Sequence, residues 1–339
     1  MTRRGSTCFL LALAVACTGD SGQSTPTSPM PAAPVDPRTL MAYFPPIDGS
    51  TWETIEPSRL GYDTAALSAA LDWAGAQRTT AVVVVWRGRM VAERYWRGWT
   101  LSKDSIIASA GKSVLSALVE SRITVRHLLG MMTGLDDSLK FVVSPGHRFY
   151  YNNPAYYQLF AVLQSISGQS INVLSRRLLF DRIGMSSATW RLNVDTGEPG
   201  WVLSCTARDM ARFGLLALNR GRWNGQPILA DSAWFTASWR SVPPDNGGYG
   251  LLWWLNGGAS YRTPGPYFLP TQNGALIPSA PTDLVAALGK GDKKIYVSPG
   301  QELVVVRHGE DADVAGANPL AVSAFDEQLW QRLKLAFRY

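Results

Sequence analysis

Ser109-Ala110-Gly111-Lys112 is the only Ser-x-x-Lys in the 339-residue sequence, and its spacing could support nucleophilic catalysis. Residues three apart on a helix lie on one face, so the Lys112 amine can approach the Ser109 hydroxyl. A lysine accepts a serine proton only if burial or a nearby positive charge lowers its pKa toward neutrality. The first helical turn also offers free N–H groups to an oxyanion. Because the motif arises about once by chance in such a chain, it needs further support.

A second group of candidate residues lies in GHRFYYNNP, residues 146–154. Two Tyr-x-Asn frames overlap there, Tyr150/Asn152 and Tyr151/Asn153. A phenol could transfer a proton and an amide could orient a substrate. Asn-Asn-Pro is also a sequence that commonly forms turns, so a purely structural role fits equally well. From the residues alone, both frames and the structural alternative stay open.

The histidines and cysteines suggest no further site. His127, His147 and His308 show neither the arrangement of a Ser-His-Asp triad nor metal-ligand spacing, so we expect no metal and no cofactor. Cys205 is the one cysteine expected to remain in the mature domain, where it is interpreted as a small buried side chain.

The elements that would position these residues follow from hydrophobic periodicity and turn residues. Strands are expected at both ends of the chain and helices between them, which indicates an antiparallel sheet built from the two termini. The predicted helices cover 64–76, much of 106–135, two segments within 154–183 joined at Ser167-Gly168, 207–220 and 324–337. The predicted strands are 82–86 with 90–95 as a hairpin, 295–297 and 303–307.

The N-terminus has the layout of a secretory signal, which we assign to residues 1–16. Arg3-Arg4 precede a short apolar run, and Ala14-Val15-Ala16-Cys17 then resembles a bacterial lipobox. Residues 17–40, rich in Ser, Thr, Pro and Gly, are expected to be a flexible tether after the lipidated Cys17. We therefore expect export and anchoring to the cell envelope by lipid only; cleavage after Ala16 without lipidation is the alternative.

Composition allows a large core and gives nucleic-acid binding little support. The chain is 46% hydrophobic and 17% charged, and its formal charge of +6 includes no long basic run. A small-molecule substrate is therefore a more reasonable partner than a nucleic acid. The oligomeric state is not indicated.

Several segments in order resemble one family, the serine β-lactamase-like hydrolases of the penicillin-recognising superfamily. The closest similarity is to its branch of class C β-lactamases, esterases and 6-aminohexanoate-dimer hydrolases, and it runs from about residue 60 to the C-terminus. The segments are Ser109–Lys112, ITVRHLLGMMTGL (123–135), PGHRFYYNNPAYYQL (145–159), LLFDRIGM (178–185) and CTARDMARFGLLALNRGRWNG (205–225).

The resemblance implies an α+β fold of the β-lactamase/transpeptidase type, an antiparallel sheet flanked by helices with an inserted helical domain. The sheet domain would comprise 41–108 plus 200–339, and the helical domain 109–199. The active site would lie in the cleft between them. YGLLWW, residues 249–254, resembles a family strand whose aromatic side chains pack on the sheet or line the cleft.

The resemblance also implies roles for the candidate residues. Ser109 would be the acyl-forming nucleophile and Lys112 its proton acceptor. The family pattern selects Tyr151 as the proton shuttle and Asn153 as a substrate-binding residue, with Tyr156 behind them. The protein would be a serine hydrolase that cleaves a small ester or amide.

A third family element, often Lys-Thr-Gly or His-x-Gly, corresponds to Ala287-Leu288-Gly289. The backbone N–H of Lys290 would then join that of Ser109 in an oxyanion hole, with Gly289 and Lys290 as substrate-binding positions. A surface turn is a competing interpretation of these residues. Ala287 replaces the family's usual cation, which argues against substrates with a carboxylate.

The chain departs from the family pattern after Val119, where Glu120-Ser121-Arg122 leads almost directly into ITVRHLL. The loop that normally borders the helical domain is missing, which puts activity in doubt. Two alternatives to a hydrolase of small esters or linear amides remain. Among enzymes the alternative is a β-lactamase or D-Ala-D-Ala peptidase. The missing loop and Ala287 motivate the other, a catalytically inactive envelope lipoprotein with a binding cleft.

Overall fold

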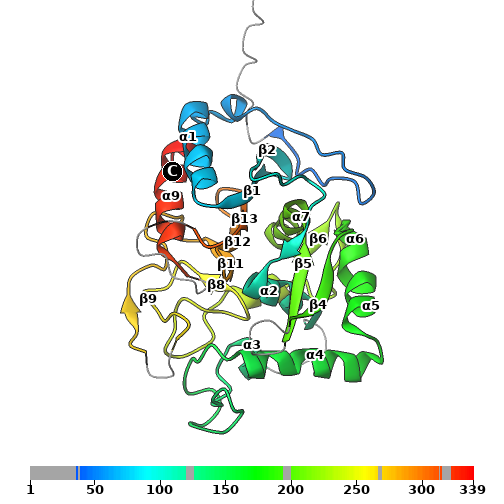
Figure 1. Ribbon diagram of the computed structural model, residues 1–339, viewed down its shortest axis with the longest axis vertical. Helices are drawn as coiled ribbons and strands as arrows, with labels where there is room; N and C mark the ends of the chain where they lie inside the picture. The colour runs from blue at the N-terminus through cyan, green and yellow to red at the C-terminus, as the bar shows by residue number, and fades with distance from the viewer. Residues whose placement is uncertain are drawn as a thin grey trace, which may run out of the picture. The chain divides into compact units, whose positions relative to one another are not determined.

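The two ends of the chain meet in one antiparallel sheet, as the strand pattern predicts (Figure 1). The computed structural model describes residues 36, 39–119, 126–193, 200–265, 269–312, 314 and 322–339. The six-stranded sheet has the order β2-β1-β13-β12-β11-β8. Its strands are β1 (Thr79–Trp86), β2 (Arg89–Tyr95), β8 (Trp254–Leu255), β11 (Val285–Gly289), β12 (Lys293–Ser298) and β13 (Leu303–Gly309).

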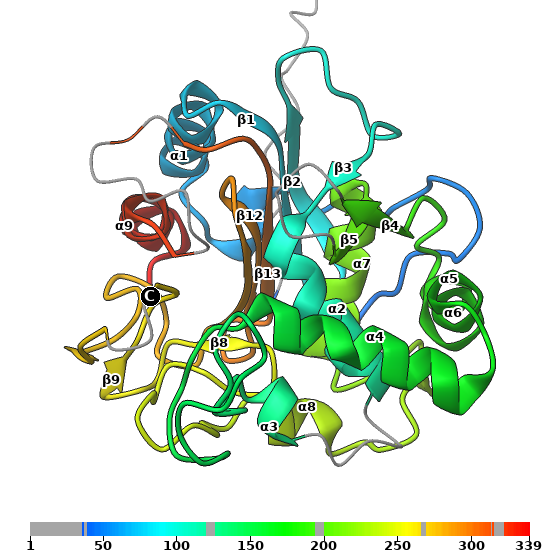
Figure 2. The same ribbon diagram turned by 60° about the horizontal axis from the view of Figure 1, so that its bottom comes forward.

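Helices cover both faces of this sheet (Figures 1 and 2). α1 (Thr64–Ala76) and α9 (Ala324–Phe337) pack together on one face, and α7 (Ala207–Leu218) packs on the other. Every residue of β1 and β13 is buried as a result. This coverage explains why these strands are nearly continuous apolar runs rather than alternating ones, since both of their faces are removed from water.

Three of the predicted helices begin directly after a residue whose side chain caps the helix. The Asp63 carboxylate accepts the Ala66 N–H at 2.9 Å at the start of α1. Thr206 with Asp209 and Ser323 with Asp326 form capping boxes at the starts of α7 and α9. The predictions of helices at 64–76, 207–220 and 324–337 are thus confirmed.

The middle of the chain is helical only in part. Its helices are α2 (Gly111–Val119), α3 (Arg126–Leu129), α4 (Asn153–Ser167), α5 (Ile171–Ser175) and α6 (Asp181–Ile183). A π-helical turn at Arg176–Phe180 divides the second helix predicted within 154–183 into α5 and α6. A three-stranded sheet of β3 (Ser105–Ile106), β5 (Gly200–Cys205) and β4 (Thr189–Asn193), which the periodicity did not predict, accompanies them.

Shorter elements complete the described part of the chain: η2 (Pro57–Leu60), η3 (Ala108–Ala110), β6 (Arg222–Trp223), β7 (Gln226–Pro227), α8 (Trp234–Ser238), β9 (Ser260–Tyr261) and β10 (Gln272–Asn273). No helix within the described ranges is long and apolar enough to span a membrane. The predicted signal, Cys17, most of the tether and the predicted shortening at 120–122 fall outside the described residues. Residues 34–339 form one compact unit, and the finer division at 109 and 199 stays a prediction.

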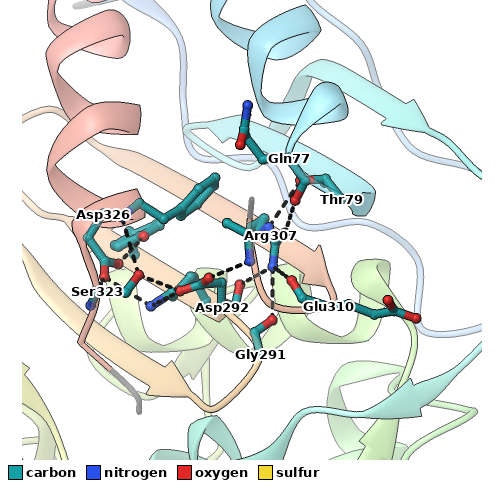
Figure 3. A network of polar contacts seen from close by, with 12 residues as sticks. Gln77, Thr79, Gly291, Asp292, Arg307, Glu310, Ser323 and Asp326 are labelled. Carbon is teal, nitrogen blue, oxygen red and sulfur yellow. Dashed lines mark hydrogen bonds and ion pairs between the residues drawn. The ribbon is translucent and has the colours of Figure 1, made fainter. Parts of the chain in front are cut away.

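A buried ionic network ties the sheet to α9 (Figure 3). Lys294 Nζ lies 3.2 Å from Asp292 Oδ1 and 3.0 Å from Asp326 Oδ2, and all three side chains are almost fully buried. Arg307 Nη1 donates to the carbonyls of Gly291 and Asp292, both at 2.9 Å. Burial of charge is tolerated here because each ion has a hydrogen-bonded partner.

Candidate active site

Ser109 stands at a sharp turn between β3 and α2. The Ile107 N–H donates to the Leu203 carbonyl at 2.9 Å, which continues the pairing of β3 with β5. Ala108 then has a φ of 48°, in the left-handed region that non-glycine residues rarely occupy. Such strain persists where surrounding structure imposes it and is concentrated at functional sites. The turn presents Ser109 at the N-terminal end of α2.

Lys112 is buried beside Ser109, as the helical spacing predicts. Its Nζ donates to Ser109 Oγ at 2.9 Å, and its side chain is only 5% exposed. The same Nζ lies 5.0 Å from the ring centroid of Tyr151 and 4.5 Å from that of Tyr156. Aromatic ring faces attract an ammonium group. A proton taken from Ser109 by Lys112 would therefore be held between two rings.

Tyr151, rather than Tyr150, lies beside Ser109. Burial raises the pKa of the Tyr151 phenol well above its usual range, while a hydrogen bond with Ser109 acts in the opposite direction. Its ring stacks on Trp254 with centroids 6.0 Å apart. Tyr150 instead donates to Asp137 Oδ2 at 2.8 Å on an exposed surface. The structure thus selects one of the two frames, with a phenol that stays protonated at neutral pH.

The two asparagines after Tyr151 have different roles. Asn152 caps α4, because its Oδ1 accepts the Ala155 N–H at 2.8 Å. Asn152 Nδ2 also donates to the Leu135 carbonyl at 2.9 Å and the Asp136 carbonyl at 3.0 Å. Asn153 Oδ1 is buried and accepts no hydrogen bond from the described residues. Since buried acceptors are normally satisfied, this oxygen is suited to a donor on a bound substrate.

The end of β11 closes against the segment that carries Ser109. A Cβ added at Gly289 would lie 2.3 Å from the Ile107 carbonyl oxygen and 3.0 Å from the Ala110 nitrogen. Glycine at this position permits the close approach, and Ala287, two residues earlier on the strand, faces the same side without a charge. The Lys290 side chain is exposed, so a contribution to an oxyanion hole would come from its backbone N–H.

The sequence reasoning missed two residues that lie next to the segment carrying Tyr151. Asp245 and Arg262 form an ion pair, and Asp245 Oδ1 accepts the Phe149 N–H at 2.8 Å. Neither residue has a motif or a spacing that could have indicated it, because Asp245 lies in a loop between prolines and glycines. Only the folded chain brings that loop next to residues 149–151.

The fold is that of a serine β-lactamase-like protein. The Beta-lactamase family model matches residues 118–307, more than half of the chain, and the chain belongs to this family. The matched range contains Tyr151, Asn153 and Gly289 but begins after Ser109 and Lys112. The roles predicted for Ser109 and Lys112 are supported instead by the 2.9 Å contact between Lys112 Nζ and Ser109 Oγ. No curated protein matches the chain in sequence.

Solved structures show the same fold. A protein from Bacteroides dorei assigned as a beta-lactamase superposes with a TM-score of 0.65 at 16% identity, covering 82% of this chain and 100% of that chain. One from Bacillus anthracis assigned as a 6-aminohexanoate-dimer hydrolase gives 0.59 at 19% identity, covering 87% and 89%. A beta-lactamase/D-alanine carboxypeptidase from Pseudomonas syringae gives 0.55 at 13% identity, covering 82% and 98%. At such identities the similarity shows the fold alone.

Proposed function

We propose that the protein is a serine hydrolase that cleaves a small ester or linear amide through an acyl-enzyme on Ser109. The observation that carries this proposal is the convergence of two proton-handling groups on one hydroxyl. Lys112 Nζ lies 2.9 Å from Ser109 Oγ, and the Tyr151 phenol lies near enough to Ser109 for that hydroxyl to act on the pKa of Tyr151. A nucleophile in contact with a base is the arrangement that covalent catalysis requires.

In the first step, Ser109 Oγ attacks the substrate carbonyl and its proton passes to a neutral Lys112. The oxyanion is stabilised by backbone N–H groups at Ser109 and Lys290. Tyr151, a neutral phenol, gives its proton to the leaving group and recovers one from Lys112. Water then attacks the acyl-enzyme, and the same groups work in reverse to release the acid and restore Ser109.

The residue at position 287 of β11 supports a choice of substrate class. Ala287 is 1% exposed and offers no charge on the face that also carries Gly289. A substrate carboxylate would receive no partner from this strand position, and an unpaired charge in a desolvated site is costly. We therefore favour an uncharged ester or linear amide over a penicillin or a D-Ala-D-Ala peptide.

Steady-state and burst kinetics test this proposal. The wild type should hydrolyse p-nitrophenyl esters with a burst of about one equivalent per chain, as acyl-enzyme kinetics require, and Ser109→Ala should not. Preferred turnover of a penicillin would support the β-lactamase alternative instead. A folded wild type that turns over neither substrate would support the inactive binding lipoprotein.

We also propose that the protein is exported and anchored through Cys17. The support is the sequence alone, namely the signal-like residues 1–16 and the lipobox that follows. Expression of the full chain in a bacterium with radiolabelled palmitate tests it. The wild type should be labelled and sediment with membranes, while Cys17→Ser should be neither labelled nor retained; equal labelling of both would refute the anchor.

A further inference from the structure

Arg262 is held in place close to Tyr151, with which it lines one small hollow. Its side chain is 4% exposed, and its Nη1 forms an ion pair with the Asp245 carboxylate. Its Nη2 donates to the Leu269 carbonyl. Asn246 holds the Arg262 backbone from both sides, since its Oδ1 accepts the Arg262 N–H at 3.0 Å and its Nδ2 donates to the Arg262 carbonyl at 3.1 Å. The charge of Arg262 is thus neutralised, and its position is fixed.

Asp245 connects Arg262 to the segment that carries Tyr151. While Oδ2 faces Arg262, Oδ1 accepts the Phe149 N–H at 2.8 Å. A carboxylate bond to a backbone N–H is stronger than a neutral one. Phe149 lies two residues before Tyr151, so the bond fixes the backbone immediately ahead of the shuttle.

Ring packing completes the restraint. The Phe149 ring lies 5.0 Å from that of Tyr249 and 6.3 Å from that of Trp254, centroid to centroid. Tyr151 stacks on the same Trp254. The cavity between Arg262 and Tyr151 has a volume of about 10 Å³, enough for roughly one water molecule. Through Trp254, these ring contacts tie the position of Tyr151 to that of Phe149.

We propose that Asp245, held by Arg262, is a positioning residue that keeps the Tyr151 hydroxyl in contact with Ser109. The inference rests on the proposed function, because it assigns Asp245 a task in the Ser109 reaction. Its expected effect is large for a residue that touches no substrate, since a displacement of about 1 Å at the reacting groups costs roughly a hundredfold in rate. The effect should fall on kcat, because Tyr151 acts in the chemical steps rather than in binding.

Three variants separate the hydrogen bond from the charge. Asp245→Ala removes the acceptor for the Phe149 N–H, whereas Asp245→Asn keeps a carbonyl oxygen in its place and loses only the negative charge. Asp231→Ala is the matched control, because Asp231 Oδ1 accepts the Ala233 N–H at 2.8 Å in an exposed loop. Thermal melts give the folded fraction of each variant, to which the kinetics are normalised.

With a p-nitrophenyl ester, kcat of Asp245→Ala should fall by about tenfold to a hundredfold while KM changes by less than about threefold. Asp245→Asn should recover most of the lost kcat, and Asp231→Ala should match the wild type. The proposal is overturned if folded Asp245→Ala keeps the wild-type kcat, if its KM alone changes, or if Asp231→Ala loses as much.

Hydrogen exchange distinguishes failure of this inference from failure of the proposed function. Asp245→Ala should accelerate amide exchange at residues 149–151, and Asp231→Ala should leave those amides unchanged. If the wild type shows no esterase activity, the proposed function fails. Hydrogen exchange then tests on its own whether Asp245 restrains residues 149–151. Unchanged exchange in Asp245→Ala would show that Asp245 does not hold this segment.

Discussion

Two buried lysines in this fold have opposite surroundings. Lys294 is fully buried and lies within 3.2 Å of two carboxylates, Asp292 and Asp326. Lys112 is nearly as buried, and its contacts include the Ser109 hydroxyl and two aromatic rings. Carboxylates hold a proton on a lysine permanently, whereas a hydroxyl can exchange one with it. Burial of a lysine is therefore structural or catalytic according to what it contacts.

The largest expected effect is the loss of activity when Lys112, the lysine beside Ser109, is replaced. Lys112→Ala should lower kcat for ester hydrolysis on the order of 10²- to 10⁴-fold, because the serine loses its proton acceptor. Circular dichroism should show the same fold as the wild type. A folded Lys112→Ala that hydrolyses esters at the wild-type rate would show that Lys112 resembles Lys294 in having no chemical role.

The adjacent tyrosines offer a matched pair. Tyr151→Phe should lower kcat on the order of a hundredfold by removing the phenolic proton, with the ring stack on Trp254 kept. Tyr150→Phe removes the bond to Asp137 on an exposed surface and should leave kcat unchanged. Steady-state kinetics on both variants test which tyrosine transfers the proton. A loss of kcat in Tyr150→Phe but not in Tyr151→Phe would assign that role to Tyr150.

At the other lysine the effect should be on stability. Lys294→Met leaves Asp292 and Asp326 buried without their cation, so the free energy of unfolding should fall by about 3–5 kcal/mol. Urea titration measures this loss. Activity per folded molecule should stay within about twofold of the wild type, because the ion pairs that are lost join Lys294 to Asp292 and Asp326 and not to Ser109. A stable Lys294→Met, or one with strongly reduced kcat, would contradict the distinction.

The smallest expected effect concerns His308, the neighbour of Arg307 on β13. Burial lowers the pKa of His308 to about 4, and the nearby Lys293 adds to this effect. The folded state therefore holds the ring neutral while the unfolded state binds a proton below pH about 6.5. Stability should fall as pH drops from about 6.5 to about 4, by roughly 3 kcal/mol from this group.

Thr80 Oγ1 lies 3.1 Å from His308 Nδ1. His308→Gln tests the source of this pH dependence, since glutamine keeps a group able to hydrogen-bond Thr80 but does not titrate. Urea titrations at several pH values between 4 and 7 should show a flatter dependence for the variant than for the wild type. Equal slopes in the two proteins would assign the acid sensitivity to other groups.

Local patterns and nonlocal packing explain what the sequence could and could not predict. α1 and α9 follow from periodicity with a capping residue at each start, and the contact between Ser109 and Lys112 follows from a three-residue helical spacing. Without the family resemblance, the residues alone left the choice between Tyr150 and Tyr151 open, because it depends on packing against Trp254, which is distant in sequence. β3 is two residues long and has no periodicity to detect. Asp245 likewise gains its role only from Phe149, which lies far from it in sequence.

Covalent labelling of Ser109 tests the central claim most directly. A fluorophosphonate probe followed by intact-mass measurement and peptide mapping should give one adduct per wild-type chain, located on Ser109. Ser109→Ala should give none, and Lys112→Ala should react far more slowly than Lys294→Met. A folded wild type that takes up no probe, or takes it up on another residue, would contradict the account.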